Sequence, residues 1–187
     1  QMLARIELVN SALGTLNAQI ETAMVPWTDK LDLLQTMPGI GPKTAQVFIA
    51  ETGGDMAPWP SAAQLAAWVG LAPAMHESAG KRTPAGSRHG NKFLASMLVE
   101  AAGSVARTKN TYLGAQYARL ASRRGQKRAA VAVAHSMLVS AYHMLNRGEP
   151  YRDLGPDWLA KRNDAAHTRR LVAQLERLGH TVTLDAA

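Results

Sequence analysis

Residues Gly70 to Leu98 read GLAPAMHESAGKRTPAGSRHGNKFLASML, and the rest of the chain is organised around this stretch. It begins as a segment broken by glycine and proline and ends as an apolar helix. Its middle is Ser78-Ala-Gly-Lys-Arg82, where a small hydroxyl stands beside a flexible glycine and two cations. Glycine lets the backbone approach a ligand closely, and cations offset phosphate charge. The stretch therefore predicts a surface that meets phosphate.

The start of the expected helix strengthens this prediction. Residues 88–92 read RHGNK, and a helix N-terminus offers free N–H groups and a favourable dipole to an anion. We therefore predict that these two parts of the stretch contact nucleic-acid phosphates through Gly80, Lys81, Arg82, Arg88, Gly90, Asn91 and Lys92.

Charge is unevenly placed along the 187 residues. Residues 81–128 contain eleven Lys or Arg and one acid, a net charge of +10, whereas the whole chain carries +7 and the remainder therefore sums to −3. A basic block within a mildly acidic chain is typical of a polyanion-binding face, although a solvated surface is the simpler alternative.

Composition favours a mainly α fold with a real core. Hydrophobic residues make up 47% of the chain, aromatic residues 5%, and runs of β-branched residues are scarce. There is no cysteine, so disulfides and thiolate metal sites are excluded, and no stretch approaches the roughly 20 apolar residues of a membrane span. No metal-ligand pattern stands out, since His135 and His143 lie eight residues apart without a third ligand.

The N-terminal residues 1–30 predict a coiled-coil-like helix. Apolar residues recur at alternating steps of three and four, which suits either a two-stranded partner or packing on the chain's own domain. The seam consists of Ile6, Val9, Leu13, Leu16, Ile20 and Ala23. Because the chain begins inside a helical pattern without Met, we expect it to be a fragment of a longer protein.

Residues 31–53 resemble a helix-hairpin-helix motif. Two apolar segments flank MPGIGPKTA, residues 37–45, where glycines permit a tight turn and proline suits the first turn of the second helix. The N–H groups freed by such a turn can bind a DNA phosphate independently of base sequence. The candidate contacts are Gly39, Gly41, Lys43 and Thr44, and the alternative is a helical hairpin that only packs.

Further helices are predicted beyond the central stretch. Periodic apolar residues and a terminal Gly148 predict a long helix over 126–147, and residues 158–178 predict a final helix. Residues 180–184 alternate and could form one short C-terminal strand.

Ser78 admits several interpretations. Ser78-Ala-Gly-Lys81 matches the S-x-x-K nucleophile motif of penicillin-binding proteins, but it lies in a Gly/Pro-rich loop and the S-D-N and K-T-G partner motifs are absent. The hydroxyl could instead donate a hydrogen bond to phosphate within a non-catalytic helix-hairpin-helix DNA-binding module.

Most of the chain resembles the C-terminal transposase domain of the DEDD-type insertion-sequence transposases, relatives of the Piv DNA invertase and known as bridge-RNA-guided recombinases. The order and spacing of several motifs carry the resemblance: LQTMPGIGPKTA at 34–45, WVGLAP at 68–73, SAGK at 78–81, Gly86, Gly90-Asn91, and a tail of R-x-L-x-x-L-G-x-x-V-x-L type that ends at Leu184.

The resemblance implies a function in DNA recombination. In this family the domain supplies a serine that joins covalently to DNA, which here is Ser78, within a composite catalytic centre shared between protomers. A RuvC-like domain N-terminal to it supplies Asp-Glu-Asp-Asp and Mg²⁺. The resemblance also implies DNA, a guide RNA and a homo-oligomer as partners, and a cytoplasmic bacterial protein associated with the nucleoid when bound.

Two departures from the family pattern qualify these expectations. Arg88 stands where the family usually has lysine, and Lys92 is the sole cation directly after Gly90-Asn91, where the family carries arginine. The acids of this chain form no Asp-Glu-Asp-Asp set, so we expect residues 31–187 to be a helical transposase domain that holds no cofactor and is inactive alone.

Overall fold

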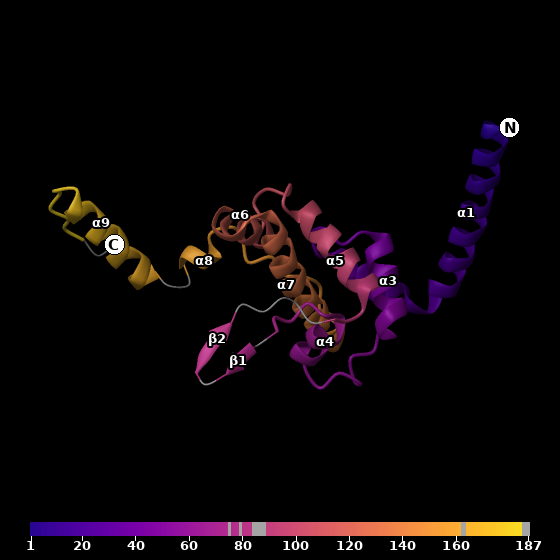
Figure 1. Ribbon diagram of the computed structural model, residues 1–187, viewed down its shortest axis with the longest axis horizontal. Coiled ribbons are helices and arrows are strands. Elements are labelled where there is room, and N and C mark those ends of the chain that lie inside the picture. Colours follow the sequence, from indigo (N-terminus) through magenta and orange to yellow (C-terminus); the bar gives the residue numbers. More distant parts are fainter. Residues whose placement is uncertain (75, 79, 84–88, 162–163, 185–187) are drawn as a thin grey trace.

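The computed structural model describes residues 1–74, 76–78, 80–83, 89–161 and 164–184, and it confirms a mainly α architecture (Figure 1). In chain order the elements are α1 Met2–Met24, the 3₁₀ turn η1 Val25–Trp27, α2 Thr28–Gln35, α3 Pro42–Thr52, α4 Ala62–Val69, β1 His76–Ser78, β2 Lys81–Thr83, α5 Lys92–Val105, α6 Tyr112–Arg124, α7 Gln126–Arg147, α8 Trp158–Lys161 and α9 Asp164–Arg177.

Helix α7 is the central element of the body. It packs along α5 and α6 and also contacts α2 and α4. Its buried face includes Ala129, Val133, Ala134 and Ala141, and such small side chains let neighbouring helices approach closely. Gly148 ends the helix in the left-handed conformation at φ 69°, as the sequence predicts.

A single hydrophobic core connects α2 to α7. The largest fully buried side chains come from different helices and meet in one cluster: Phe48, Leu34, Met37, Leu65, Leu94, Leu98, Leu113, Met137 and Leu138. A hydrogen bond from the Tyr142 hydroxyl to the Trp59 carbonyl (2.8 Å) attaches the loop before α4 to α7. The body is therefore closed by contacts between residues far apart in the sequence.

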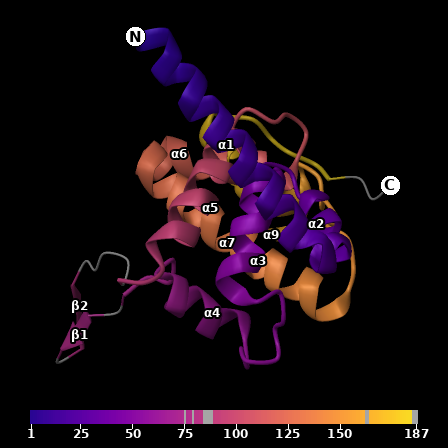
Figure 2. The same cartoon turned by 90° about the vertical axis from the view of Figure 1, so that its right-hand side faces the viewer.

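Three parts of the chain stand away from this body (Figures 1 and 2). Helix α1 contains no buried residue, and its predicted apolar seam is exposed. The hairpin β1–β2 projects to one side in both views, and α8 and α9 extend from the end opposite α1. No helix in the described ranges is both long and apolar enough to cross a bilayer.

Two sequence expectations need correction, and a third, the final helix over 158–178, agrees with the helices assigned to its described residues. Residues 180–184 have no strand assignment, because a strand needs a paired neighbour and the sheet in the described part consists of β1 and β2 alone. The final helix is assigned as α8 and α9, with residues 162–163 between them outside the described residues. The expected loop around Ser78 contains an antiparallel hairpin.

Candidate nucleic-acid interface

The β1–β2 hairpin carries Ser78 at its tip. The backbone register pairs His76 with Thr83, Glu77 with Arg82, and Ser78 with Lys81. Gly80 turns the chain at φ 73°, and nothing lies within 4 Å of where a side chain would begin, so the turn needs glycine for its conformation and not for packing. Ser78 and Lys81 thus occupy facing positions beside the turn.

The predicted site residues in this segment are described to different extents. Lys81 and Gly80 are exposed to solvent. For Ser78 and Arg82 the backbone alone is described, and Arg88 lies outside the described residues. The backbone register places Ser78 and Lys81 in the pair beside the turn and Arg82 in the next pair.

Gly90 and Asn91 join the hairpin segment to the helical body. A side chain on Gly90 would start 2.4 Å from the backbone nitrogen of Gly70 and 2.5 Å from the Trp68 carbonyl oxygen. The same carbonyl accepts a hydrogen bond from the Asn91 N–H (3.2 Å). Glycine is required at this position because the start of α5 lies directly against the end of α4.

Asn91 is the N-cap of α5. Its Oδ1 accepts a hydrogen bond from the Leu94 N–H (3.0 Å), and its Nδ2 donates to Glu51 Oε2 on α3. Gly90 and Asn91 therefore have internal roles, since the glycine packs on α4 and both polar atoms of the amide have partners within the protein. Their contacts with phosphate stay predictions. Lys92, the next residue, is exposed.

The four candidate residues of the turn between α2 and α3 also differ in their surroundings, since two pack inside the protein and two face open space or solvent. A side chain on Gly39 would start 2.4 Å from Val105 Cγ2 and 2.8 Å from the Ala101 carbonyl oxygen, so this glycine serves packing against α5. Thr44 is buried. Gly41, by contrast, has open space around it, and Lys43 is exposed in the first turn of α3. These last two remain available to a ligand.

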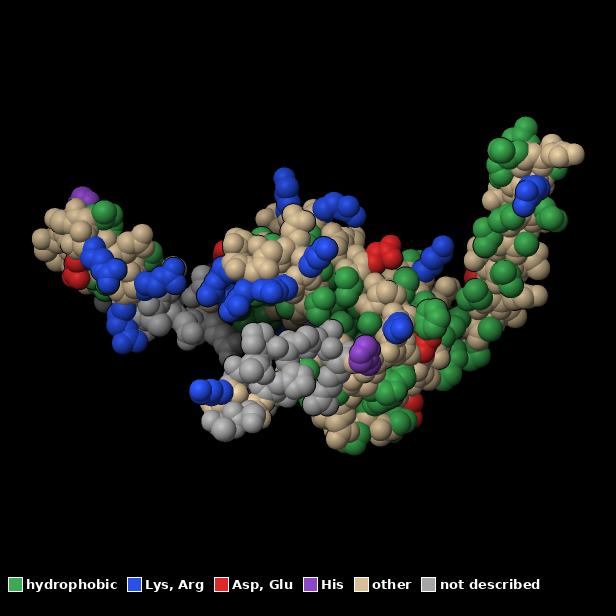
Figure 3. Space-filling model, in the orientation of Figure 1, with side chains coloured by type: hydrophobic (Ala, Val, Ile, Leu, Met, Phe, Trp, Pro, Cys, Tyr) green, Lys and Arg blue, Asp and Glu red, His purple; other side chains and the backbone are tan. Residues whose placement is uncertain are grey.

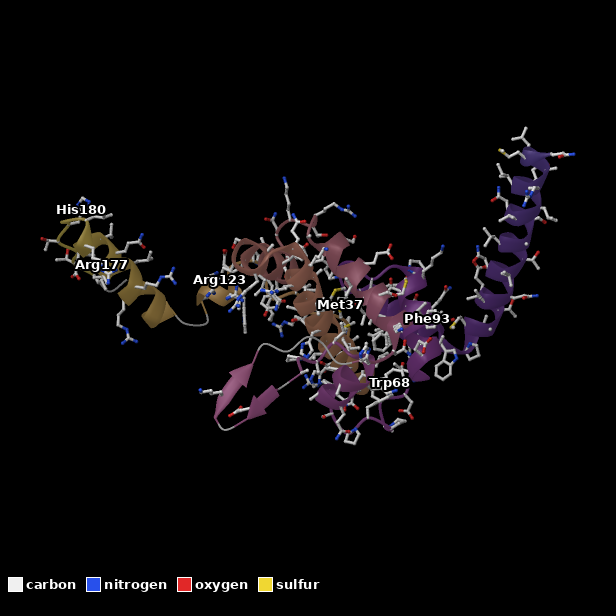
Figure 4. All side chains as sticks on the ribbon, in the orientation of Figure 1. Met37, Trp68, Phe93, Arg123, Arg177 and His180 are labelled. Atoms are coloured by element: carbon white, nitrogen blue, oxygen red, sulfur yellow. The ribbon has the colours of Figure 1, made fainter. Side chains whose placement is uncertain are left out.

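A cationic corner lies where α6 meets α7. We use this name for the five exposed cations at the end of α6 and the start of α7, which flank the turn at Gly125: Arg119, Arg123, Arg124, Lys127 and Arg128. None of the five forms an ion pair with another described residue within 4.0 Å. Lys and Arg side chains gather over α6 in Figure 3, and Arg123 is labelled there in Figure 4. Both ribbon views place α6 and the hairpin on the same side of α7.

A pocket of about 280 Å³ opens at the base of the hairpin. We call it the α4–α5 pocket. Its walls come from the end of α4, the first two turns of α5 and one residue of α7, and its lining is Val69, Gly70, Leu71, His89, Gly90, Lys92, Ala95, Ser96, Val99 and Val131. The sequence did not predict this pocket, because its walls are apolar residues from distant parts of the chain.

Two exposed aromatic side chains near this junction were also missed. Phe93, in the first turn of α5, is 75% exposed, and Trp68, near the end of α4, is 38% exposed and contacts Trp59 with ring centroids 4.8 Å apart (Figure 4). A signal for Phe93 was present, since it falls outside the core periodicity set by Leu94, Leu98 and Ala101.

Candidate metal ligands are dispersed in the described part of the chain. In the described ranges no group of three or more His, Cys, Asp or Glu side chains lies close enough together to hold a metal ion. Magnesium requires oxygen ligands in octahedral geometry, normally including one or two carboxylates. That this chain holds no metal therefore stays a prediction.

The model of the Transposase IS116/IS110/IS902 family aligns with the body from α2 through most of α6. Residues 31–118 match this transposase family. We refer to them as the transposase-family domain, which contains the α2–α3 turn, the hairpin and all of α5.

Individual relatives are transposases as well. The chain is 31% identical over 156 residues to the transposase for insertion sequence element IS1111A of Coxiella burnetii, which covers 78% of the chain and 41% of that protein. It is 34% identical over 124 residues to the putative transposase y4pF/y4sB of Sinorhizobium fredii, and the alignment covers 64% of the chain and 32% of that protein. A probable family 20 transposase of Pseudomonas aeruginosa is 28% identical to the chain over 151 residues, and the alignment covers 79% of the chain and 44% of that protein. The chain thus spans less than half the length of these curated relatives.

Proposed function

We propose that this chain is the nucleic-acid-binding, serine-bearing part of a transposase that moves an insertion sequence by cleaving and exchanging DNA strands. The transposase-family match supports the general activity. The single observation that carries the finer assignment is the hairpin, which presents the backbone of Ser78 opposite Lys81 at a tip standing away from the helical body.

In the proposed reaction, Ser78 attacks a backbone phosphate of DNA. A bond forms between the serine oxygen and phosphorus, the phosphorus–oxygen bond to one strand end breaks, and that end leaves as a hydroxyl after taking up a proton. A serine hydroxyl is a weak nucleophile by itself. It needs a group that activates it and positive charge that stabilises the transition state. Lys81 supplies positive charge beside the reacting phosphate. In this proposal the activating group belongs to the domain that carries the Asp-Glu-Asp-Asp set, and it takes up the proton of the serine hydroxyl.

We place the binding of DNA on the hairpin side of α7. The cationic corner, Lys81 and Lys92 present unpaired positive charge there, and neutralising phosphates with such cations releases counterions and drives association. At the α2–α3 turn, Gly41 and Lys43 form a further contact in the manner of a helix-hairpin-helix.

The remaining parts of the proposal concern the whole protein. A RuvC-like domain would hold Mg²⁺, a guide RNA would select the target, and α1 would bring protomers together through its exposed apolar seam. We expect such a protein in the bacterial cytoplasm and on the nucleoid.

The test compares Ser78→Ala with Lys81→Ala in a protein that joins this chain to the metal-binding domain. Loss of one hydroxyl should cost DNA binding about 1 kcal/mol or less while strand exchange falls by orders of magnitude. Lys81→Ala should weaken both by moderate amounts, because a cation acts in the ground state and the transition state alike. A Ser78→Ala protein that exchanges strands at the wild-type rate would favour the alternative, a non-catalytic DNA-binding module.

A further inference from the structure

We propose that the α4–α5 pocket binds one unpaired nucleobase of the nucleic acid that the hairpin engages. The inference rests on the proposed function, since it names a chemical group within the same nucleic-acid partner. It assigns a position-specific contact to a surface otherwise expected to touch only phosphates.

The lining of the pocket suits the face of a base. Val69 and Leu71 at the end of α4, Val99 on α5 and Val131 on α7 provide apolar walls, and the described lining residues include no phenylalanine, tyrosine or tryptophan. Its volume of about 280 Å³ is just below the roughly 300–1,000 Å³ of pockets for drug-sized ligands, so it suits one small flat group. Aliphatic walls bury the faces of such a group and favour its removal from water.

Polar groups at the rim suit the rest of a nucleotide. The Ser96 hydroxyl donates to the Phe93 carbonyl oxygen (2.9 Å), which leaves its own oxygen free to accept from an amino group on a base edge. The exposed side chains of Lys92 and His89 also line the pocket, and none of its described lining residues is acidic. The rim can therefore accommodate the negative charge of the phosphates that flank a bound base.

The position of the pocket connects it to the hairpin. Leu71 and His89 both line it, so the segment that carries Ser78 leaves the body and returns to it at the pocket. Ser78 follows Leu71 by seven positions in the sequence, so their Cα atoms are at most about 25 Å apart. Figures 1 and 2 show α4 beside the base of the hairpin. A base held in the pocket would therefore keep its strand within reach of the hairpin tip.

The energetic cost of taking a base out of the stack predicts which DNA the pocket should prefer. Removing a base from the stack costs a few kcal/mol in a perfect duplex and least where the base is unpaired. A pocket for one base should therefore favour DNA with a bulge over fully paired DNA of the same length.

The experiment uses the chain of residues 1–187 and a DNA duplex with a single bulged 2-aminopurine, together with the same duplex fully paired. Fluorescence of 2-aminopurine is quenched by stacking on neighbouring bases, and the described residues that line the pocket include no Phe, Tyr or Trp to replace them. We expect fluorescence to rise on binding and affinity for the bulged duplex to exceed that for the paired one by about tenfold.

Ser96→Leu tests the pocket directly. Leucine fills the opening from an exposed position on α5 and favours the helix, so the fold should survive. It should abolish the fluorescence rise and lower affinity for the bulged duplex about tenfold, to that of the paired duplex. Ser104→Leu is the matched control, because Ser104 is also exposed on α5 but lies outside the pocket.

The possible failures are distinct. If the wild-type chain binds both duplexes but shows neither the fluorescence rise nor a preference for the bulge, the pocket assignment is wrong and the proposed function stands. The same holds if Ser96→Leu behaves like Ser104→Leu. If the wild-type chain binds neither duplex, the proposed nucleic-acid function fails and the pocket assignment fails with it.

Discussion

Glycines show most clearly what a single residue does in this molecule. Gly39 and Gly90 were expected to approach phosphate, yet a side chain on either would start 2.4 Å from an atom of a neighbouring element. Gly41 and Gly80 have no such neighbour within 4 Å. A sequence records that a position lacks a side chain, but the neighbour that requires the space comes from a distant segment and becomes visible only in the fold.

Gly90→Ala should destabilise the protein by about 1–3 kcal/mol, because the new methyl group meets the backbone of residues 68–70, which cannot yield as a flexible side chain can. Urea unfolding followed by circular dichroism measures the change.

Gly103→Ala is the control for that substitution. It lies in the same helix α5 with nothing within 4 Å, so alanine should raise stability by about 0.5–1 kcal/mol. Equal stability of Gly90→Ala and the wild type would show that the α4–α5 junction has more room than described.

At the scale of elements, local signals predicted best. Gly148 ends α7 at the expected residue. The N-cap of α4 is equally local, since Ser61, a residue type that favours helix starts, accepts a hydrogen bond from the Gln64 N–H (3.3 Å). These features depend on neighbours within four residues. The hairpin was missed because its strands have three residues each and no alternating pattern, so its pairing is not encoded in local periodicity.

Helix α7 also contains a group whose titration should report on folding. Partial burial lowers the pKa of His135 below its usual value of 6.5. The unfolded chain therefore binds more protons than the folded one between these two pKa values. The resulting contribution to stability is present above about pH 6.5 and is lost as pH falls toward the folded pKa.

His135→Gln should therefore lose less stability than the wild type when pH is lowered from 7 to 5.5, measured as the shift in urea midpoint. His143→Gln is the matched control on the same helix, because His143 is exposed. If His135→Gln and His143→Gln show the same pH dependence as the wild type, burial of His135 does not contribute.

On the scale of the whole molecule, charge rather than shape defines the expected nucleic-acid face. The block of +10 over residues 81–128 was evident in the sequence, and the fold brings five of its cations together across the turn at Gly125. The sequence does not predict that these cations lie on the same side of α7 as the hairpin, because that depends on how α6 packs on α7.

Binding of duplex DNA by residues 1–187 should weaken steeply with salt. If the cationic corner contacts phosphates, the double variant Arg123→Gln/Arg124→Gln should reduce the slope of log affinity against log salt by about 1–2. Arg5→Gln, on the exposed helix α1 far from this face, should leave the slope unchanged. Equal slopes for the double variant and the wild type would place the DNA elsewhere.

The central claim is that Ser78 becomes covalently joined to DNA, and mapping that bond tests it most directly. The protein that joins this chain to the metal-binding domain would be incubated with Mg²⁺ and a nicked substrate that traps the intermediate, and the adduct would be located by mass spectrometry. We predict a DNA adduct on the peptide that contains Ser78, none with Ser78→Ala, and none with residues 1–187 alone. An adduct that persists in Ser78→Ala, or that maps to another residue, would contradict the account.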